Sequence, residues 1–315
     1  MEKILFIVPH LSTGGMPQFV LKQIEIFKEK YEIYLVEWED ITGGVYVVQR
    51  NAIQQLLGDR FFSLNHEKSI LEIIQKVNPS VIHFHEVPET FIDNTRLEKI
   101  YSNEREYFIV VTTHSSTTDP SSFNYIADRY ILVSEWSKDI FVEHFGESTS
   151  CEVWEYPIEK IEYDKEASKT EMGWNDEKTH VLNVGLFTRG KNQGALFALA
   201  KTLGDDFVFH FVGNQAMNFE DYWGPLMKDV PSNCIVHGER SDVDRFYKAA
   251  DIFYFTSNFE LSPLAVKEAL SYGLPTFIKK LHTYKDMYDG KVSYIMGDSE
   301  IDRRNLIEMS DIKIR

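Results

Sequence analysis

Residues 251–277 read DIFYFTSNFELSPLAVKEALSYGLPTF, and this stretch contains the pattern that decides the fold. Its first seven residues form an apolar run typical of a strand that is buried on both faces. Ser262 and Pro263 then favour a helix start, because serine caps free amides and proline needs no N–H partner in the first turn. Gly273 and Pro275 predict where this helix ends. A strand followed directly by a helix is the repeating unit of a parallel α/β sheet.

The same alternation of strand and helix continues along the whole chain. Apolar runs such as KILFIVPHL (3–11) precede segments with a helical period such as PQFVLKQIEIFKEK (17–30). A charged stretch at 159–179 has almost no aliphatic periodicity, and the pattern restarts after it with HVLNVGLF (180–187). Two successive series favour an α/β fold of two facing, Rossmann-like, doubly wound domains. We expect these domains at residues 1–160 and 175–300, followed by a short tail at 301–315.

Composition indicates a globular protein that stays in a reducing compartment. Of the 315 residues, 43% are hydrophobic and 26% are charged, which is ordinary for a soluble domain. No run approaches the roughly 18 apolar residues of a membrane span, and the first ten residues lack the layout of a signal peptide. Cys151 and Cys234 are far apart and make no metal-binding spacing. We therefore expect a cytoplasmic protein.

The distribution of charge argues against an anionic partner. The net charge is −16, and residues 1–155 hold 13 Lys and Arg against 24 Asp and Glu, a net of −11. An acidic first half is a poor surface for a phosphate backbone or an anionic membrane. Nucleic acid is thus disfavoured as a partner.

Two glutamates flank the predicted helix start. The loop NFELS follows a strand, and ligands of open α/β sheets bind at the carboxyl edge of the strands. The backbone N–H groups of Leu264 and Ala265 would favour an anion there, by roughly 0.3–1 kcal/mol. Glu260 and Glu268 would repel that anion, so each is better suited to hydroxyls on either side of it. A nucleoside diphosphate sugar has this layout. On this segment alone, a loop charge and a solvated helix charge are equally consistent.

The stretch FELSPLAVKEALSYGLPTF resembles the Glu-x7-Glu segment of retaining glycosyltransferases of family four, which have the GT-B fold. The resemblance implies that Glu260 faces the donor sugar and that Glu268 holds the ribose hydroxyls. Ser262 and Leu264 would present amides to the diphosphate. Pro263 stands where the family commonly has glycine, and proline cannot donate a hydrogen bond.

The loop VGLFTRGKNQG (184–194) carries two cations after a predicted strand. Read physically, Arg189 and Lys191 beside Gly185 are suited to neutralising a diphosphate, although a solvated basic turn is the alternative. The loop resembles the family's Gly-Arg-x-x-x-x-Lys motif. Leu186 occupies the usual arginine position, so we expect Arg189 to substitute for that cation.

The glycine pair in HLSTGGMPQ (10–18) lies at a strand-to-helix junction. Gly14 and Gly15 alone do not make the G-x-G-x-x-G fingerprint, which ranks an NAD-dependent oxidoreductase last. The segment resembles the amino-terminal glycine loop of the same transferases, which lets the backbone approach donor and acceptor. A plain tight turn is the alternative.

Histidines follow or occupy two strands of the first half. His114 ends FIVVTTH, where the family commonly has a histidine near the reacting sugar, and Glu86 is expected to meet the acceptor. His83 and His85 beside Glu86 look like metal ligands. However, the two histidines share one strand face and no third ligand is evident, so we predict no metal.

Together these features predict a glycosyltransferase, and the resemblance implies that it needs no metal, retains the anomeric configuration and acts in glycan biosynthesis. The resemblance places the donor in the second domain and the acceptor in the first, with UDP as the expected nucleotide and no other cofactor. Family members end with a long helix that crosses back to the first domain, for which the tail leaves little length. Alternatives are a sugar-nucleotide epimerase of the same fold, a non-catalytic nucleotide-sugar-binding protein, and a modified DNA base as acceptor. The expected catalytic residues are His114, Glu260, Lys191 and Arg189.

Overall fold

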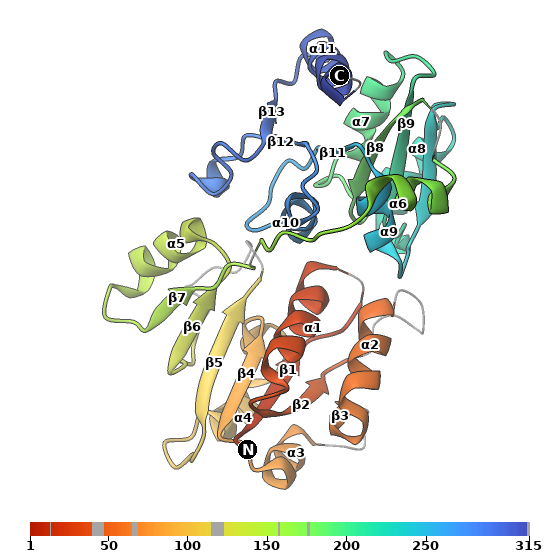
Figure 1. Ribbon diagram of the computed structural model, residues 1–315. Helices are drawn as coiled ribbons and strands as arrows, with labels where there is room; N and C mark the ends of the chain where they lie inside the picture. Colours follow the sequence, from red (N-terminus) through yellow and green to blue (C-terminus); the bar gives the residue numbers. More distant parts are fainter. Residues whose placement is uncertain are drawn as a thin grey trace. The chain divides into compact units, whose positions relative to one another are not determined.

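The structure is a computed structural model that describes residues 1–12, 14–39, 47–64, 69–114, 123–156, 158–174 and 177–313, with side chains up to 311. The chain forms two compact units, Met1–Glu155 and Tyr156–Arg315. Each unit is built on one parallel sheet with helices on both faces (Figure 1). The prediction of two doubly wound α/β domains is therefore confirmed.

The first unit has a seven-stranded sheet in the order β3-β2-β1-β4-β5-β6-β7. Every neighbouring pair in it is parallel, and the strand order reverses between β1 and β4. The strands are β1 (Lys3–Val8), β2 (Glu32–Glu37), β3 (Phe61–Ser63), β4 (Val81–His85), β5 (Phe108–Thr113), β6 (Arg129–Leu132) and β7 (Cys151–Val153). The α-helices are α1 (Gly15–Phe27), α2 (Val48–Leu57), α3 (Ile70–Val77), α4 (Asn94–Ile100) and α5 (Glu135–Phe145), with 3-10 turns at Gly58–Arg60 and Pro88–Thr90.

The second unit has a six-stranded sheet in the order β10-β9-β8-β11-β12-β13, again parallel throughout. Its strands are β8 (Thr179–Val184), β9 (Phe207–Val212), β10 (Cys234–Gly238), β11 (Ile252–Phe255), β12 (Thr276–Lys279) and β13 (Ser293–Ile295). Its α-helices are α6 (Lys165–Met172), α7 (Gln193–Ala200), α8 (Glu220–Met227), α9 (Val243–Ala249), α10 (Leu264–Ser271) and α11 (Ser299–Lys313), with 3-10 turns at Met217–Phe219 and His282–Tyr284.

The apolar strands predicted from sequence are buried on both faces. In β11 all four residues are buried, and Phe253 and Tyr254 belong to cores on opposite faces of the sheet. Helices α9 and α10 contribute Phe246 and Val266 to one of these cores, whereas α7 and α11 contribute Leu196 and Leu306 to the other. The sheet of the second unit is therefore held rigidly between two helical layers, which gives its loops a fixed base.

A helix, α6, occupies part of the charged stretch 159–179, which the sequence predicted as the junction between the two domains. In α6 the side chain of Asp164 accepts a hydrogen bond from the amide of Ala167, 3.0 Å away, and caps the first turn. Lys165 and Lys169 both pair with Asp251 at 3.0 Å. Capping and ion pairs thus stabilise this helix, which periodicity of aliphatic residues could not reveal.

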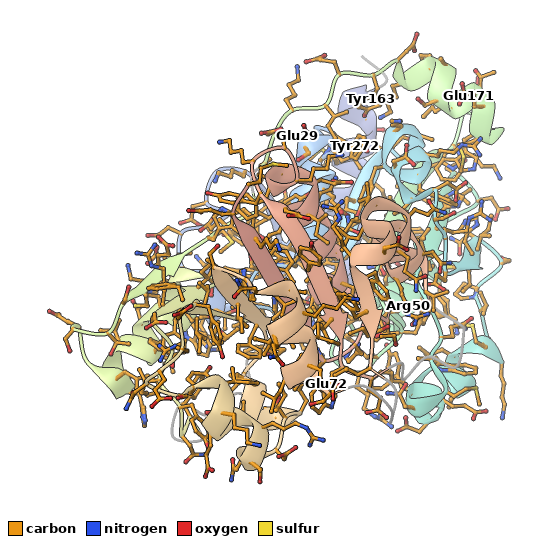
Figure 2. All side chains as sticks on the ribbon, turned by 90° about the horizontal axis from the view of Figure 1, so that it is seen from below. Glu29, Arg50, Glu72, Tyr163, Glu171 and Tyr272 are labelled. Atoms are coloured by element: carbon orange, nitrogen blue, oxygen red, sulfur yellow. The ribbon has the colours of Figure 1, made fainter. Side chains whose placement is uncertain are left out.

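The segment that leads into the second unit is tied to the end of α10. The hydroxyl of Tyr163 donates to the carbonyl of Tyr272 at 3.0 Å, and the two rings meet edge to face. Both residues are labelled in Figure 2. The amide of Ile161 donates to the carbonyl of Ser271 at 2.8 Å. These bonds satisfy carbonyls that a helix leaves free at its C-terminus.

Candidate functional site

The candidate site lies where the strand order of the second sheet reverses, between β8 and β11. The loop after β8 and the loop after β11 leave the same carboxyl edge of two adjacent parallel strands. Three hydrogen bonds join them: Thr256 Oγ1 donates to Lys191 O (3.0 Å), and the amide and side chain of Asn258 donate to Gly190 O and Arg189 O (2.8 and 3.3 Å). Such a switch point is where open α/β sheets bind their ligands.

Gly185 packs against backbone at the start of this loop. A Cβ atom at Gly213 would lie 2.0 Å from the carbonyl oxygen of Gly185, so the ends of β8 and β9 approach too closely for any side chain. On its other side, the stem of Lys191 lies 3.7 Å from where a Cβ of Gly185 would be. The Lys191 stem therefore packs over Gly185 at the end of β8, at a distance that an ordinary van der Waals contact would have. A direct contact of Gly185 with a donor stays a prediction.

Lys191 and Glu260, which the sequence assigned to the donor, are brought together. Their side chains form an ion pair, and the side chains are 30% and 12% exposed, respectively. Ser257 Oγ donates to the same carboxylate oxygen of Glu260 at 2.6 Å, and Thr283 donates to the carbonyl of Glu260. The ammonium of Lys191 also lies 5.3 Å from the centre of the Phe255 ring. Glu260 is thus fixed by Lys191, Ser257 and Thr283, and it is not an unconstrained charge in a loop.

Arg189 is not brought to this ion pair. Its guanidinium pairs with Asp221 at the start of α8 at 2.8 Å, and both side chains are largely exposed, at 72% and 68%. This hydrogen bond lowers the pKa of the Asp221 carboxyl. The role of Arg189 as a donor-binding cation stays a prediction, and it requires the guanidinium to leave Asp221.

Helix α10 begins one residue later than the sequence predicted. Pro263 precedes its first turn, and no side chain caps that turn, so Ser262 does not have the expected capping role. The helix starts at Leu264, and Gly273 adopts a φ of 67° just beyond its C-terminal end, as predicted for a terminating glycine. Because no side chain caps this N-terminus, its backbone N–H groups can donate hydrogen bonds to an anion.

Glu268 is partly buried on α10 and faces α9. Its Oε2 lies 3.0 Å from the hydroxyl of Tyr247, which also lies 3.2 Å from the carbonyl of Ala265. Burial, and then the nearby Glu268 carboxylate, raise the pKa of Tyr247 well above its usual value. Tyr247 therefore remains a neutral donor that orients the Glu268 carboxylate. This geometry does not fit a freely solvated helix charge.

Sequence reasoning missed Ser257, Tyr247, Thr283 and Lys279 as parts of this site. Lys279 is the last residue of β12, and its ammonium donates to Asn258 Oδ1 at 2.6 Å. Burial lowers the pKa of Lys279. The signal that could have found it is its place at the carboxyl end of a strand adjacent to β11.

In the first unit, the predicted residues follow three adjacent strands. Gly14 and Gly15 lie after β1, Glu86 after β4 and His114 after β5. Glu86 has a φ of 101°, which is costly for a residue with a side chain, and its amide donates to the carbonyl of Thr112 at 2.8 Å. Their expected contacts with donor and acceptor stay predictions. Residues 115–122, which follow His114, lie outside the described residues.

The histidines of this unit stack in a row. The rings of His83 and His85 lie 4.3 Å apart and those of His85 and His114 lie 5.6 Å apart, while Phe19 meets His114 edge-on at 4.8 Å. Burial lowers the pKa of His83 and of His114 to about 3. In the described parts of the chain, no group of three or more His, Cys, Asp or Glu side chains could hold a metal ion.

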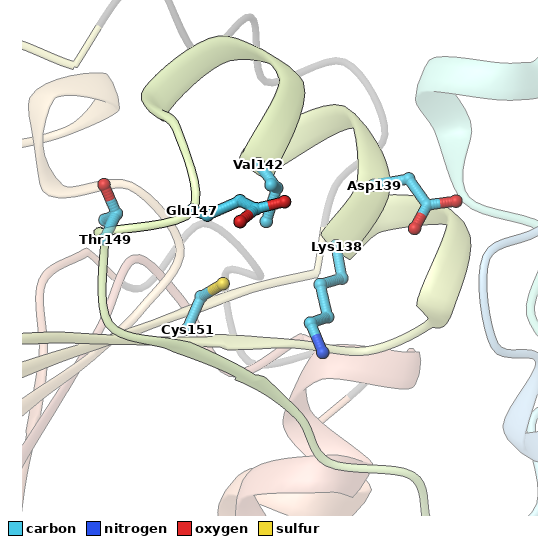
Figure 3. Close-up of a pocket in the computed structure, with 6 residues that line it drawn as sticks. All are labelled: Lys138, Asp139, Val142, Glu147, Thr149 and Cys151. Atoms are coloured by element: carbon cyan, nitrogen blue, oxygen red, sulfur yellow. The ribbon is translucent and has the colours of Figure 1, made fainter.

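A hollow of about 530 Å³ opens elsewhere in the first unit, beside α5 and β7 (Figure 3). Its lining residues are Lys138, Asp139, Val142, Glu147, Thr149 and Cys151. None of the predicted site residues lines it.

Among the described helices, none combines the length and the apolar character that a membrane span needs.

The sequence of the second unit matches a known family. Residues 164–297 match the family described as glycosyl transferases group 1. The Escherichia coli UDP-Gal:alpha-D-GlcNAc-diphosphoundecaprenol alpha-1,3-galactosyltransferase is 28% identical over 129 residues, which are 39% of this chain and 33% of that protein. The alpha-galactosylglucosyldiacylglycerol synthase of Streptococcus pneumoniae is 28% identical over 140 residues, 42% of this chain and 37% of that protein. The match thus spans about a third of each relative.

Solved structures resemble the chain over nearly its whole length. Anabaena HepE in complex with UDP and glucose has a TM-score of 0.79 at 14% identity, covering 98% of this chain and 89% of that one. Sucrose-phosphate synthase from Thermosynechococcus elongatus has a TM-score of 0.71 at 13% identity, covering 98% and 90%. At such identities the likeness concerns the fold alone, which is that of GT-B glycosyltransferases.

Proposed function

We propose that the protein is a glycosyltransferase that moves a sugar from a nucleoside diphosphate donor to an acceptor hydroxyl. The observation that carries this proposal is the paired arrangement of Lys191 with Glu260 and of Tyr247 with Glu268, at the switch point of the second sheet. These four residues lie within the segment that matches glycosyl transferases group 1. The two carboxylates flank a helix N-terminus that suits a phosphate.

On the nucleoside side, Glu268 accepts hydrogen bonds from the two ribose hydroxyls. A carboxylate has lone pairs for several donors, so Tyr247 can keep its hydrogen bond while the ribose occupies the remaining positions. Charge-assisted hydrogen bonds of this kind contribute about 1.5–3 kcal/mol each. The buried Tyr247 fixes the carboxylate before the donor arrives, so less ordering is needed on binding.

On the sugar side, Lys191 exchanges partners. In the structure it is bound to Glu260, but a diphosphate carries more negative charge than one carboxylate and can take the ammonium over. Glu260, still hydrogen-bonded by Ser257, is then available to the sugar hydroxyls. When the sugar–phosphate bond breaks, Lys191 and the amides at the start of α10 stabilise the charge on the leaving diphosphate. Preorganised charge of this sort is commonly the largest catalytic contribution.

We propose UDP as the donor nucleotide, a hydroxyl of a glycan as the acceptor, and retention of the anomeric configuration without a metal. The name of the Escherichia coli relative includes UDP-Gal, and the Anabaena structure holds UDP and glucose, which supports the choice of UDP. The net charge of −11 in residues 1–155 disfavours a nucleic acid as acceptor. Retention follows from the Glu-x7-Glu resemblance, in which the leaving phosphate accepts the proton of the acceptor hydroxyl.

A panel of nucleotide sugars incubated with the protein tests this function. Release of free nucleoside diphosphate with some donor, increased by a glycan acceptor and abolished in Glu268→Ala, is the expected result. Conversion of the donor to a different nucleotide sugar without release would instead indicate an epimerase. Tight binding with neither reaction would indicate a sensor, and absence of binding to every member of the panel would overturn the proposal.

A further inference from the structure

Lys279 occupies the carboxyl edge of the second sheet beside the candidate site. It is one residue beyond the last position of β12 that pairs with β11, where Ile278 lies opposite Phe255, and it pairs with Ile295 of β13 on the other side. The loop that carries Glu260 leaves β11 at this same edge. Lys279 therefore lies at the edge where both strands present their ends to a ligand.

A single residue connects Lys279 to the loop that carries Lys191. The ammonium of Lys279 donates to Asn258 Oδ1 at 2.6 Å. Asn258 in turn donates from its amide to Gly190 O at 2.8 Å and from its side chain to Arg189 O at 3.3 Å. These bonds link the Lys279 ammonium to the turn between Arg189 and Lys191. The sequence predicted that this turn binds the diphosphate, because it carries two cations and resembles a family motif.

The charges around this turn are already compensated, except at Lys279. Lys191 is paired with Glu260, and Arg189 is paired with Asp221. Within the described ranges of the chain, no carboxylate forms an ion pair with Lys279, whose bonded partner is a neutral amide. Burial lowers the pKa of Lys279, which means that its surroundings disfavour the charged form.

We propose that Lys279 binds the diphosphate of the donor together with Lys191, and so supplies the second cation that the sequence lacks at Leu186. This inference rests on the proposed function. A diphosphate provides the anionic partner that the partly buried ammonium is missing, and the amide of Asn258 can rotate while the lysine stem stays in place. The specificity that results is for the diphosphate group, whatever base and sugar it carries.

The neighbouring lysine provides a matched control. Lys280 is exposed, and its ammonium lies 5.3 Å from the centre of the Tyr294 ring. Removing its charge changes the net charge of the protein as much as removing that of Lys279. Lys280 has no bond to Asn258 or to the turn at Arg189 in the structure.

Calorimetric titrations with UDP, GDP, ADP and uridine test this role in the wild type and in Lys279→Met, Lys279→Arg and Lys280→Met. We expect Lys279→Met to weaken binding of the preferred nucleoside diphosphate at least tenfold, with thermal unfolding and any uridine binding unchanged. Lys279→Arg should recover part of the loss, and Lys280→Met should bind like the wild type.

Equal diphosphate affinity of Lys279→Met and wild type would overturn this inference alone, as would an equal loss of affinity in Lys280→Met. A parallel loss of uridine and diphosphate binding would also overturn it, because that pattern marks a distorted site. A wild type that binds none of the nucleoside diphosphates would overturn both this inference and the proposed function. The failure of each is therefore distinguishable.

Discussion

Lys191 and Glu260 form an ion pair although they are 69 positions apart in the sequence. One residue follows β8 and the other follows β11, and these strands are neighbours only because the strand order reverses there. In the proposed function, each residue occupies the place that the sugar or the phosphate of a donor would take. Binding of a donor would then exchange the partner of each charge, so the protein would not need to desolvate two isolated charges.

Substituting Glu260 separates its ion pair with Lys191 from its proposed contact with the donor sugar. In Glu260→Gln the amide no longer competes for the charge of Lys191, so we expect UDP to bind about fivefold more tightly, the equivalent of the roughly 1 kcal/mol that a partly exposed ion pair contributes. Transfer activity should fall, because in the proposed function Glu260 binds the sugar hydroxyls. Titration calorimetry and a transfer assay measure the two effects. Asp229→Asn, which removes the partner of the exposed Lys201, serves as the control and should change neither. Weaker UDP binding by Glu260→Gln would contradict the exchange of partners.

The pair of Glu268 and Tyr247 makes a prediction about the ribose. Glu268→Ala should weaken UDP binding by roughly 1.5–3 kcal/mol, because the proposed hydrogen bonds from the ribose hydroxyls to Glu268 are lost. Binding of 2′,3′-dideoxy-UDP should not change, because this nucleotide lacks both hydroxyls. Tyr247→Phe should have a smaller effect of the same kind, since the carboxylate remains but loses its orienting donor. Calorimetry with both nucleotides completes a double cycle. An equal loss for the two nucleotides would remove Glu268 from the ribose.

The sequence could predict the parts of this site that are local. The apolar run of β11, the start of α10 to within one residue and its terminating Gly273 all follow from neighbouring residues. It could not predict partners contributed by distant strands, such as Tyr247 for Glu268. The sequence could not indicate Lys279 for the same reason: its partner Asn258 is 21 positions away, in the loop that follows β11. Periodicity likewise missed α6, whose stability comes from caps and ion pairs.

The close approach of Gly185 and Gly213 predicts a stability effect. In Gly213→Ala the new methyl group would lie 2.0 Å from the carbonyl oxygen of Gly185, so β8 and β9 must separate at their carboxyl ends. We expect a loss of about 3 kcal/mol in unfolding free energy, at the upper end for an overpacked position, with weaker donor binding. Urea unfolding measures the loss. Gly204→Ala is the control, because a methyl group there meets nothing within 4 Å. Equal stability of the two variants would contradict the packing.

A second row of histidines crosses the sheet of the second unit. His210 Nε2 lies 2.9 Å from His180 Nδ1, and His210 Nδ1 lies 3.0 Å from His237 Nε2, so both nitrogens of His210 are engaged by imidazoles. Trp174 stacks on His210 with ring centres 3.8 Å apart. Burial, and then the neighbouring imidazoles, lower the pKa of His210 to about 2. A positive charge at His210 would therefore face the imidazoles of His180 and His237.

This row predicts that the second unit loses stability in mild acid. His210 stays neutral in the folded state, whereas in the unfolded chain it takes up a proton below about pH 6.5. The contribution of neutral His210 to the free energy of unfolding is therefore complete above pH 6.5. It falls as the pH drops toward the folded-state pKa, and about 2 kcal/mol is lost at pH 5. Urea unfolding at pH 7.5 and pH 5.0 measures this loss. His210→Gln keeps a polar side chain that does not titrate and should show a smaller loss, by about that amount. The exposed His144→Gln should behave like the wild type, and the same pH dependence in His210→Gln and wild type would show that His210 is not the group responsible.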